Sequence, residues 1–214
     1  MKIQRFHDRR EAGQLLGRRI AAAKFKTRPV VLALPRGGVV IGAEIARSLK
    51  CPLRALIVRK VGVPFEPELA MGAIASGGYR YINEALVARF QIDSHEIERV
   101  IKEEETELHR RERVYQSDFE SLGIKGKSIV IADDGVATGA TMEVAIRAVQ
   151  SQDPLEIDIA IPVAALSTVE HFHRLISRCF VLETPNGLGA IGEFYEEFLP
   201  VSDDEVVSLL RESH

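Results

Sequence analysis

The feature that most constrains the fold is a series of short apolar runs separated by segments of helical periodicity. The runs lie at residues 29–34, 53–60, 129–132, 155–161 and 178–183. Those at 29–34 and 129–132 are apolar throughout, those at 53–60 and 178–183 have an apolar centre, and the run at 155–161 alternates. A strand that is apolar on both sides must be covered on both faces of its sheet. The intervening helices supply that cover through crossover connections. The pattern therefore predicts an α/β fold, a Rossmann-like parallel sheet with helices on both faces.

The length of 214 residues is that of a single domain. We expect its core over about residues 29–183. Residues 61–92 combine the prolines and glycines of a loop with two short strand-like pieces around "GGY", and they predict a mobile loop or flap. The tail at about 184–214 predicts a small hood, to which the N-terminal segment could contribute. A long charged helix is expected over residues 93–119, with most of its charges on a solvated face.

Charge and hydropathy argue against several classes of function. The 28 basic residues nearly match the 31 acidic ones, so a net charge of −3 gives no extended basic surface for nucleic acid. No apolar run approaches the ~18 residues of a membrane span, and the charged N-terminus lacks the apolar core of a signal peptide. Cys51 and Cys179 stand far apart, which fits a reducing compartment. We therefore expect a cytoplasmic protein with neither nucleic-acid nor membrane partners.

The stretch "IVIADDGVATGAT" at residues 129–141 leads an apolar strand into two adjacent carboxylates. In a parallel α/β sheet, ligands bind beyond the carboxyl ends of the strands, so Asp133 and Asp134 lie at a binding edge. Carboxylates repel phosphate, but they accept hydrogen bonds from vicinal hydroxyls or hold Mg²⁺ through water. The pair therefore suits a sugar diol or a metal ion.

The small residues after the acids suit a phosphate group. Gly135, Gly139 and Ala140 leave backbone N–H groups accessible, and the next helix adds its positive N-terminal dipole. Thr138 and Thr141 can add hydroxyls to the same oxygens. A diol site beside a phosphate site predicts recognition of a sugar phosphate.

A helix cap is the alternative interpretation of the two acids. The chain offers its own comparison, because Asp203 and Asp204 follow Ser202 at a predicted helix start, where acids in the first turn are ordinary. Asp133 and Asp134 instead end a strand, several residues before the next helix. That context favours a binding site.

Residues 129–141 resemble the phosphoribosyl pyrophosphate (PRPP) motif of the class I phosphoribosyltransferases. In that family the acids hold the ribose hydroxyls and the loop binds the 5′-phosphate. The resemblance implies that Asp133 and Asp134 hold the ribose 2′- and 3′-hydroxyls. It assigns the 5′-phosphate to Ala137, Thr138, Gly139, Ala140 and Thr141.

Two further segments match the family in its own order. "LPRGG" at residues 34–38 resembles the family's pyrophosphate loop, where a non-proline cis peptide is common. "VRK" at residues 58–60 resembles its Arg-Lys contact to pyrophosphate at the end of the second strand. Together the three matches cover most of residues 29–150. The pyrophosphate ligands that they imply are Arg36, Gly37, Gly38, Arg59 and Lys60.

The resemblance implies an enzyme that transfers the 5-phosphoribosyl group of PRPP to a nitrogen acceptor, which is a glycosyltransferase of the pentosyltransferase class. Its catalytic residues would be Asp133, Asp134, Arg36 and Lys60. Mg²⁺ would be the cofactor, held by the two aspartates through water. The partners would be small molecules, PRPP and an unknown acceptor, and a homodimer is left open.

The acceptor is not identified by the sequence. Family members that use 6-oxopurines carry an Asp where this chain has Ala137, which argues against hypoxanthine and guanine. Phe194 or Tyr195 in the tail, or Phe65 in the flap, could stack on the acceptor, and each could equally belong to the core. Gly135 stands where relatives carry a bulky apolar residue, which predicts a looser diol end.

Two other functions fit the same motifs: a non-catalytic sensor of PRPP or nucleotides, and a hydrolase or phosphorylase-like enzyme that uses water or phosphate as acceptor. The presence of Arg36, Arg59 and Lys60 favours catalysis, because a sensor need not handle pyrophosphate.

Three weaker motifs are rejected. The glycines at 187–192 are not followed by the helix and strand of a dinucleotide site. "GKS" at 126–128 precedes a strand, whereas a P-loop follows one. His171 and His173 lie two apart on a predicted helix, about 200° around its axis, and cannot share one metal ion.

Overall fold

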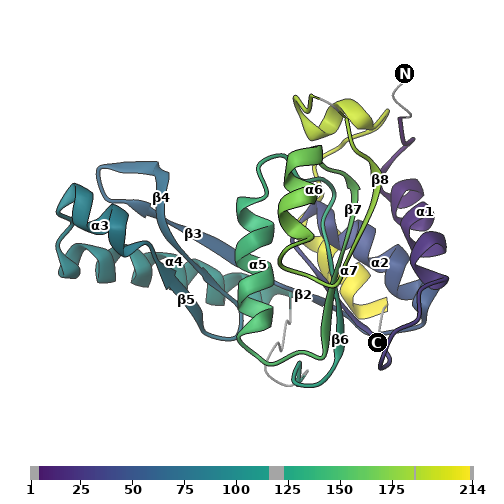
Figure 1. Ribbon diagram of the computed structural model, residues 1–214, viewed down its shortest axis with the longest axis horizontal. Coiled ribbons are helices and arrows are strands. Elements are labelled where there is room, and N and C mark those ends of the chain that lie inside the picture. Colours follow the sequence, from purple (N-terminus) through teal and green to yellow (C-terminus); the bar gives the residue numbers. More distant parts are fainter. Residues whose placement is uncertain (1–4, 116–122, 186, 213–214) are drawn as a thin grey trace.

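A five-stranded parallel sheet forms the centre of the computed structural model, which describes residues 5–115, 123–185 and 187–212 (Figure 1). The strand order is β2–β1–β6–β7–β8. After β1 the chain adds a strand on one side and later returns to add β6 on the other, so the switch point lies between β1 and β6. The strands are β1 Val30–Ala33, β2 Leu53–Ala55, β6 Ser128–Ala132, β7 Glu156–Val163 and β8 Arg178–Glu183.

Helices cover both faces of this sheet, as the apolar runs predict. Val31 and Ala33 of β1 pack among residues of the helices on one face, whereas Val30 and Leu32 pack among those on the other. This alternation along a fully buried strand divides the core into two layers. The first face carries α1 Arg9–Ala21, α2 Gly37–Leu49 and α7 Asp203–Glu212, and the second carries α5 Ala140–Gln150 and α6 Leu166–Phe172.

The expectation of one strand over residues 53–60 is wrong. The run divides at the buried residues Leu56 and Ile57, whose backbones form hydrogen bonds with different parts of the chain. Leu56 N–H still donates to Ala33 of the parallel sheet at 2.9 Å, while the Ile57 carbonyl accepts from Ser76 N–H at 2.9 Å. The "VRK" segment therefore begins a strand of a second sheet instead of ending the second strand of the first.

The second sheet is antiparallel and projects from one side of the molecule (Figure 1). It is built from β3 Val58–Val63, β4 Glu66–Ala75 and β5 Tyr79–Ile82, followed by α3 Glu84–Phe90. The two strand-like pieces around "GGY" are confirmed, and the turn between them uses Gly77 and Gly78 at φ +81° and +76°. The loop character expected for the rest of residues 61–92 is wrong, because cross-strand pairing and α3 order most of this segment.

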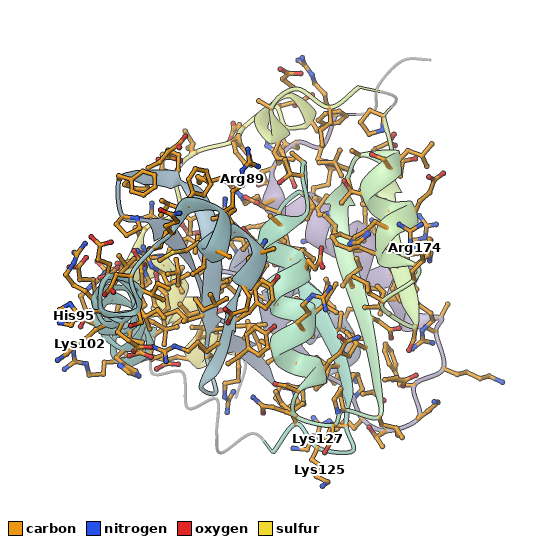
Figure 2. The ribbon with its side chains drawn as sticks, turned by 60° about the vertical axis from the view of Figure 1, so that its left-hand side comes forward. Arg89, His95, Lys102, Lys125, Lys127 and Arg174 are labelled. Atoms are coloured by element: carbon orange, nitrogen blue, oxygen red, sulfur yellow. The ribbon has the colours of Figure 1, made fainter. Side chains whose placement is uncertain are left out.

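The long charged helix is α4 Ser94–Tyr115. Its buried residues are Ile101, Leu108 and Tyr115, spaced by sevens, which gives a narrow apolar seam. Figure 2 shows His95 and Lys102 pointing away from the body of the molecule, so this part of the helix carries charge on its outer side. The remainder of the expected helix, residues 116–119, lies outside the described residues.

The N-terminal segment pairs with the tail of the chain. Phe6 N–H donates to the Phe194 carbonyl at 2.9 Å, and Glu196 N–H donates to the Phe6 carbonyl at 2.8 Å. The short helix η2 Ile191–Phe194 lies in this assembly. We use the word hood for residues 5–7 together with 190–201. Among the described helices, none is long and apolar enough to cross a membrane.

A buried ion pair in the sheet gives a test of the core. The Asp158 side chain is fully buried and accepts from Arg178 Nε at 2.9 Å and Nη2 at 2.6 Å. Removing one partner of a buried pair leaves an uncompensated charge. We expect Arg178→Gln to lower the free energy of unfolding by about 3 kcal/mol in urea titrations. Arg99→Gln, which breaks the exposed Arg99–Glu103 pair on α4, should cost less than about 1 kcal/mol. Equal costs for both variants would contradict this assignment.

Candidate functional site

The two loops singled out by the sequence meet at the switch point of the sheet. Leu34, just after β1, donates its N–H to the Ala132 carbonyl at the end of β6 at 2.9 Å. The following Pro35–Arg36 peptide bond is cis, as the resemblance implies. The "PRGG" turn therefore starts α2 directly beside the loop that carries the acids.

Gly37 and Gly38 are required by this proximity. A Cβ on Gly37 would lie 1.9 Å from Asp134 Oδ2, and one on Gly38 would lie 2.9 Å from both the Ala132 carbonyl oxygen and Asp133 Cα. Side chains at either position would push the loops apart. Because Gly37 and Gly38 lack side chains, the loop expected to bind pyrophosphate can pack against the two acids expected to bind the diol.

Asp133 and Asp134 both lie at the carboxyl end of β6, where the sequence predicts them. The Asp133 carboxylate accepts from Asp134 N–H at 2.9 Å. Burial, reinforced by the neighbouring Asp134 charge, raises the pKa of Asp133 well above its ordinary value. Two oxygen-donor carboxylates are suited to Mg²⁺ held through water and to hydroxyl groups. The described residues contain no cluster of three or more His, Cys, Asp or Glu that could hold a metal ion, so these two would need water or substrate oxygens to complete a coordination shell.

Arg9 contacts the acid pair, and sequence reasoning missed it. Its Nε donates to Asp134 Oδ2 at 2.8 Å, and its Nη1 donates to the Leu199 carbonyl at 2.8 Å. The guanidinium lies 3.7 Å from the centre of the Phe198 ring, and the Arg9 side chain is only 11% exposed. Arg9 therefore joins α1, the hood and the acid loop. No local pattern marks it, because its partners are 125 and 190 positions away in the chain.

The expected phosphate loop runs from the acids to the start of α5. Gly139 is the residue before the helix and has φ +83°, a left-handed conformation that favours glycine. A Cβ there would lie 2.8 Å from Thr168 Cγ2. Ala137, Thr138, Ala140 and Thr141 are exposed, so the loop is open to a ligand at the N-terminus of an 11-residue helix.

The cations expected to bind pyrophosphate do not all lie beside the acid pair. Arg36 is half exposed and lies 3.9 Å from Asp203 at the start of α7. Arg59 forms an ion pair with Glu104 of α4 at 2.6 Å. Lys60 is exposed on β3. Arg36 thus belongs to the loop beside the acids, whereas Arg59 and Lys60 come from β3 of the antiparallel sheet.

The looser diol end expected from Gly135 is wrong. A Cβ on Gly135 would lie 2.3 Å from Ile191 Cγ2, so the hood already fills the space that a larger residue would occupy. Ile191 therefore supplies from a distant segment the apolar bulk that the loop lacks.

The acceptor role expected of Phe194 and Tyr195 needs correction. Their exposed fractions are 2% and 4%, and a stacking surface must be accessible. The Tyr195 hydroxyl instead donates to the Asp134 carbonyl at 2.6 Å. Phe65 is 64% exposed but packs edge-on against Phe90 in the flap. Phe198, which the sequence analysis did not single out, stacks on Tyr195 and remains 37% exposed.

Comparison with known proteins places this arrangement among relatives. The family model described as "Phosphoribosyl transferase domain" matches residues 7–193. Two curated proteins of Mycobacterium tuberculosis, from strains CDC 1551 and H37Rv and both provisionally named phosphoribosyl transferases, are 38% identical over 209 residues. The match covers 98% of this chain and 47% of each relative, so the chain spans about half the length of the curated relatives it matches. A crystal structure of a protein from Thermus thermophilus has 37% identity and a TM-score of 0.82, covering 98% of this chain and 99% of that one.

The raised pKa of Asp133 predicts how the acid pair affects stability. A carboxyl whose pKa rises on folding stabilises the folded state in its protonated form. That contribution is complete below the ordinary value of 3.8 and is lost as the pH rises through the higher folded value. Ionised Asp133 therefore destabilises the ligand-free protein at neutral pH. We expect Asp133→Asn to raise the free energy of unfolding in metal-free buffer, and by more at pH 8 than at pH 5.

Asp204→Asn is the matched control for this prediction. Asp204 is exposed in the first turn of α7, and its loss should change stability by less than about 0.5 kcal/mol at either pH. Denaturant titrations at the two pH values provide the measurement. An Asp133→Asn protein that is less stable than wild type at pH 8 would contradict the assignment.

Proposed function

Because this chain belongs to the phosphoribosyl transferase domain family, we propose that it transfers the 5-phosphoribosyl group of PRPP to a nitrogen acceptor. The C1–oxygen bond to pyrophosphate breaks, a C1–nitrogen bond forms, and pyrophosphate leaves. This is the reaction of a glycosyltransferase of the pentosyltransferase class.

One observation carries the proposal: two adjacent carboxylates, a loop of small residues before α5 and a glycine turn that carries Arg36 meet at the switch point of one sheet. The loop after β1 and the loop after β6 touch through Gly37 and Asp134. PRPP presents a 5′-phosphate, a 2′,3′-diol and a pyrophosphate around one ribose. The three elements match these three groups.

Asp133 and Asp134 hold the ribose in this proposal. Their oxygens accept from the 2′- and 3′-hydroxyls and stand near the positive charge that develops on the sugar as pyrophosphate departs. Arg9 and the Tyr195 hydroxyl fix the Asp134 side chain and carbonyl, respectively. A fixed acceptor stabilises the transition state without the cost of reorienting at the moment of reaction. The 5′-phosphate binds the N–H groups from Ala137 to Thr141 at the N-terminus of α5.

The departing pyrophosphate carries negative charge away from C1, and cations must stabilise that charge. Arg36 is next to the acid loop, and Arg59 and Lys60 lie on β3, just before the flap. When bound, Mg²⁺ would neutralise pyrophosphate oxygens, and Asp133 and Asp134 would hold it through water. Closure of the flap residues over the sugar would exclude water, which otherwise competes with the acceptor.

The acceptor site lies on the hood side of the acids. Among the described residues of the hood, Phe198 is a partly exposed aromatic ring that could line this site, with Tyr195 and the Arg9 guanidinium packed against it. Ala137 offers no carboxylate toward a 6-oxopurine. We therefore propose an acceptor other than hypoxanthine or guanine.

A non-catalytic sensor of PRPP or nucleotides is the second candidate. It is favoured by the pairing of Arg59 with Glu104 at 2.6 Å, in which both side chains are partly buried. Cations that are already neutralised can bind a ligand loosely without driving the departure of pyrophosphate. Such a protein would bind PRPP and release nothing.

The direct test is Mg²⁺-dependent release of pyrophosphate from PRPP in the presence of a panel of nucleobases and amines. We expect release with at least one acceptor, and a loss of at least about 100-fold in Asp133→Asn/Asp134→Asn, because the fixed charges beside the sugar are removed. Asp204→Asn, in the other acidic pair, should retain the wild-type rate. Binding of PRPP without release in any mixture would favour the sensor, and release without an acceptor would favour a hydrolase. Absence of both binding and release would refute the proposal.

The Arg59–Glu104 pair gives a second test. Glu104→Gln removes the carboxylate that competes with pyrophosphate for the Arg59 guanidinium at 2.6 Å. We expect it to tighten pyrophosphate binding by roughly 2- to 10-fold in calorimetric titrations, an effect typical of one partly exposed ion pair. Glu98→Gln, which breaks the neighbouring exposed pair with Arg80, should leave the affinity unchanged. Equal affinities in both variants would show that Arg59 does not contact pyrophosphate.

A further inference from the structure

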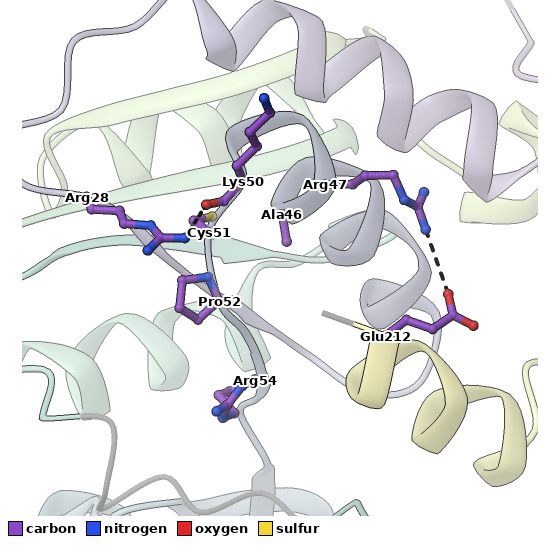
Figure 3. A pocket seen from close by; sticks show the side chains of 8 residues that line it. All are labelled: Arg28, Ala46, Arg47, Lys50, Cys51, Pro52, Arg54 and Glu212. Atoms are coloured by element: carbon purple, nitrogen blue, oxygen red, sulfur yellow. Dashed lines mark hydrogen bonds and ion pairs between the residues drawn. The ribbon is translucent and has the colours of Figure 1, made fainter. Parts of the chain in front are cut away.

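A second concave surface lies at the opposite edge of the sheet from the candidate site. It is a hollow of about 470 Å³ between the residues that precede β1 and β2 and the ends of α2 and α7 (Figure 3). This volume falls in the range of sites for small molecules. The lining residues are Arg28, Ala46, Arg47, Lys50, Cys51, Pro52, Arg54 and Glu212.

The hollow is strongly cationic in a chain that is acidic overall. Four of its lining side chains are basic and one, Glu212, is acidic, whereas the whole chain carries −3. Arg47 has two carboxylates near it, Glu44 at 2.5 Å and Glu212 at 4.0 Å. Neither Arg28 nor Lys50 forms an ion pair with a carboxylate in the part of the chain that the structure describes.

Capping of α2 does not account for this charge. The left-handed residue Lys50 ends α2, and its own N–H donates to the Ala46 and Arg47 carbonyls. Cys51 N–H also donates to the Ala46 carbonyl, at 3.1 Å. The backbone thus satisfies much of the helix end by itself. The helix dipole places about half a negative charge at the C-terminus of α2, which is less than the excess of basic over acidic side chains that line the hollow.

The cations are arranged so that an anion could displace their present contacts. Figure 3 shows Arg28 reaching across the hollow to the Lys50 carbonyl, a neutral acceptor at 2.5 Å that leaves the guanidinium charge in place. Arg47 donates to the buried Glu44 carboxylate through Nη1, while its Nη2 lies 4.0 Å from Glu212, and the Arg47 and Glu212 side chains are both more than half exposed. An exposed pair of this kind contributes little energy. Burial raises the pKa of the Cys51 thiol to about 11, so this side chain adds no negative charge at neutral pH.

We propose that this hollow is a binding site for a small phosphorylated anion, held by Arg28 and Lys50 with help from Arg47. A guanidinium binds phosphate oxygens through two parallel N–H groups, and a lysine ammonium adds a point charge. Ala46 and Pro52 provide the apolar part of the wall. The site is separate from the loops at the carboxyl ends of β1 and β6, and it does not rest on the proposed transfer reaction.

The test uses radiolabelled inorganic pyrophosphate as the probe, in equilibrium dialysis at low ionic strength without Mg²⁺. We expect the wild type to bind at the hollow and, if the proposed function holds, at the Arg36 loop as well. Arg28→Gln/Lys50→Gln should weaken binding at the hollow by at least tenfold and keep the second site. Arg36→Gln/Lys60→Gln should do the reverse, so failure of either proposal is distinguishable from failure of the other.

Matched variants control for general charge and for folding. Arg18→Gln/Lys102→Gln removes two exposed cations from α1 and α4, outside the hollow, and should bind like wild type. Glu212→Gln removes the only carboxylate among the lining residues and should tighten binding at the hollow severalfold. Arg28→Lys should keep part of the affinity. The proposal is overturned if Arg28→Gln/Lys50→Gln binds pyrophosphate with the same stoichiometry and affinity as the Arg18→Gln/Lys102→Gln control.

Discussion

The close contact between the turn after β1 and the loop after β6 is the constraint on which the site depends. A Cβ on Gly37 would overlap the Asp134 carboxylate, and one on Gly38 would crowd the Asp133 backbone. Both strands must therefore be immediate neighbours, and the turn after β1 must lack side chains at the contact. The parallel pairing of β1 with β6 supplies the first condition, and "RGG" supplies the second. Arg36 directly precedes these two glycines, so its guanidinium lies at the edge of the candidate site.

That contact concentrates negative charge in a partly buried place, and other segments offset it. Arg9 pairs with Asp134 from α1, and Tyr195 holds the Asp134 carbonyl from the hood. Among the described residues no cation forms an ion pair with Asp133: burial is the largest cause of its raised pKa and the Asp134 charge the second, while the Arg9 charge lowers it. An acid kept in a position that disfavours its charge reduces stability in the ligand-free state. Such a residue is retained for what it binds, which agrees with a site for hydroxyls or a metal ion.

The sequence predicts those parts of the molecule that depend on local patterns. Continuous apolar runs such as Val30–Ala33 identify buried strands, and the acids and glycines after Ile131 point to the candidate binding edge, because each signal lies within a few residues. The division of residues 53–60 between two sheets is not predictable in this way. Leu56 and Ile57 are both apolar and both buried, and only their hydrogen-bond partners, Ala33 and Ser76, decide which sheet each one joins. Arg9 is missed for the same reason, since its role is defined by Asp134, far along the chain.

The two proposed anion sites differ in how they attract phosphate, and the difference follows from which end of a helix each one uses. In the site proposed at the carboxyl edge of the sheet, phosphate would meet the N-terminus of α5, where backbone N–H groups and the helix dipole would bind it without any cationic side chain. The phosphate can therefore lie near Asp133 and Asp134 in a loop of small residues. At the opposite edge the hollow lies at the C-terminus of α2, whose carbonyls repel anions. An anion could bind there only if positive side chains outweigh the negative end of the helix dipole. In the proposed site Arg28 and Lys50 supply that positive charge.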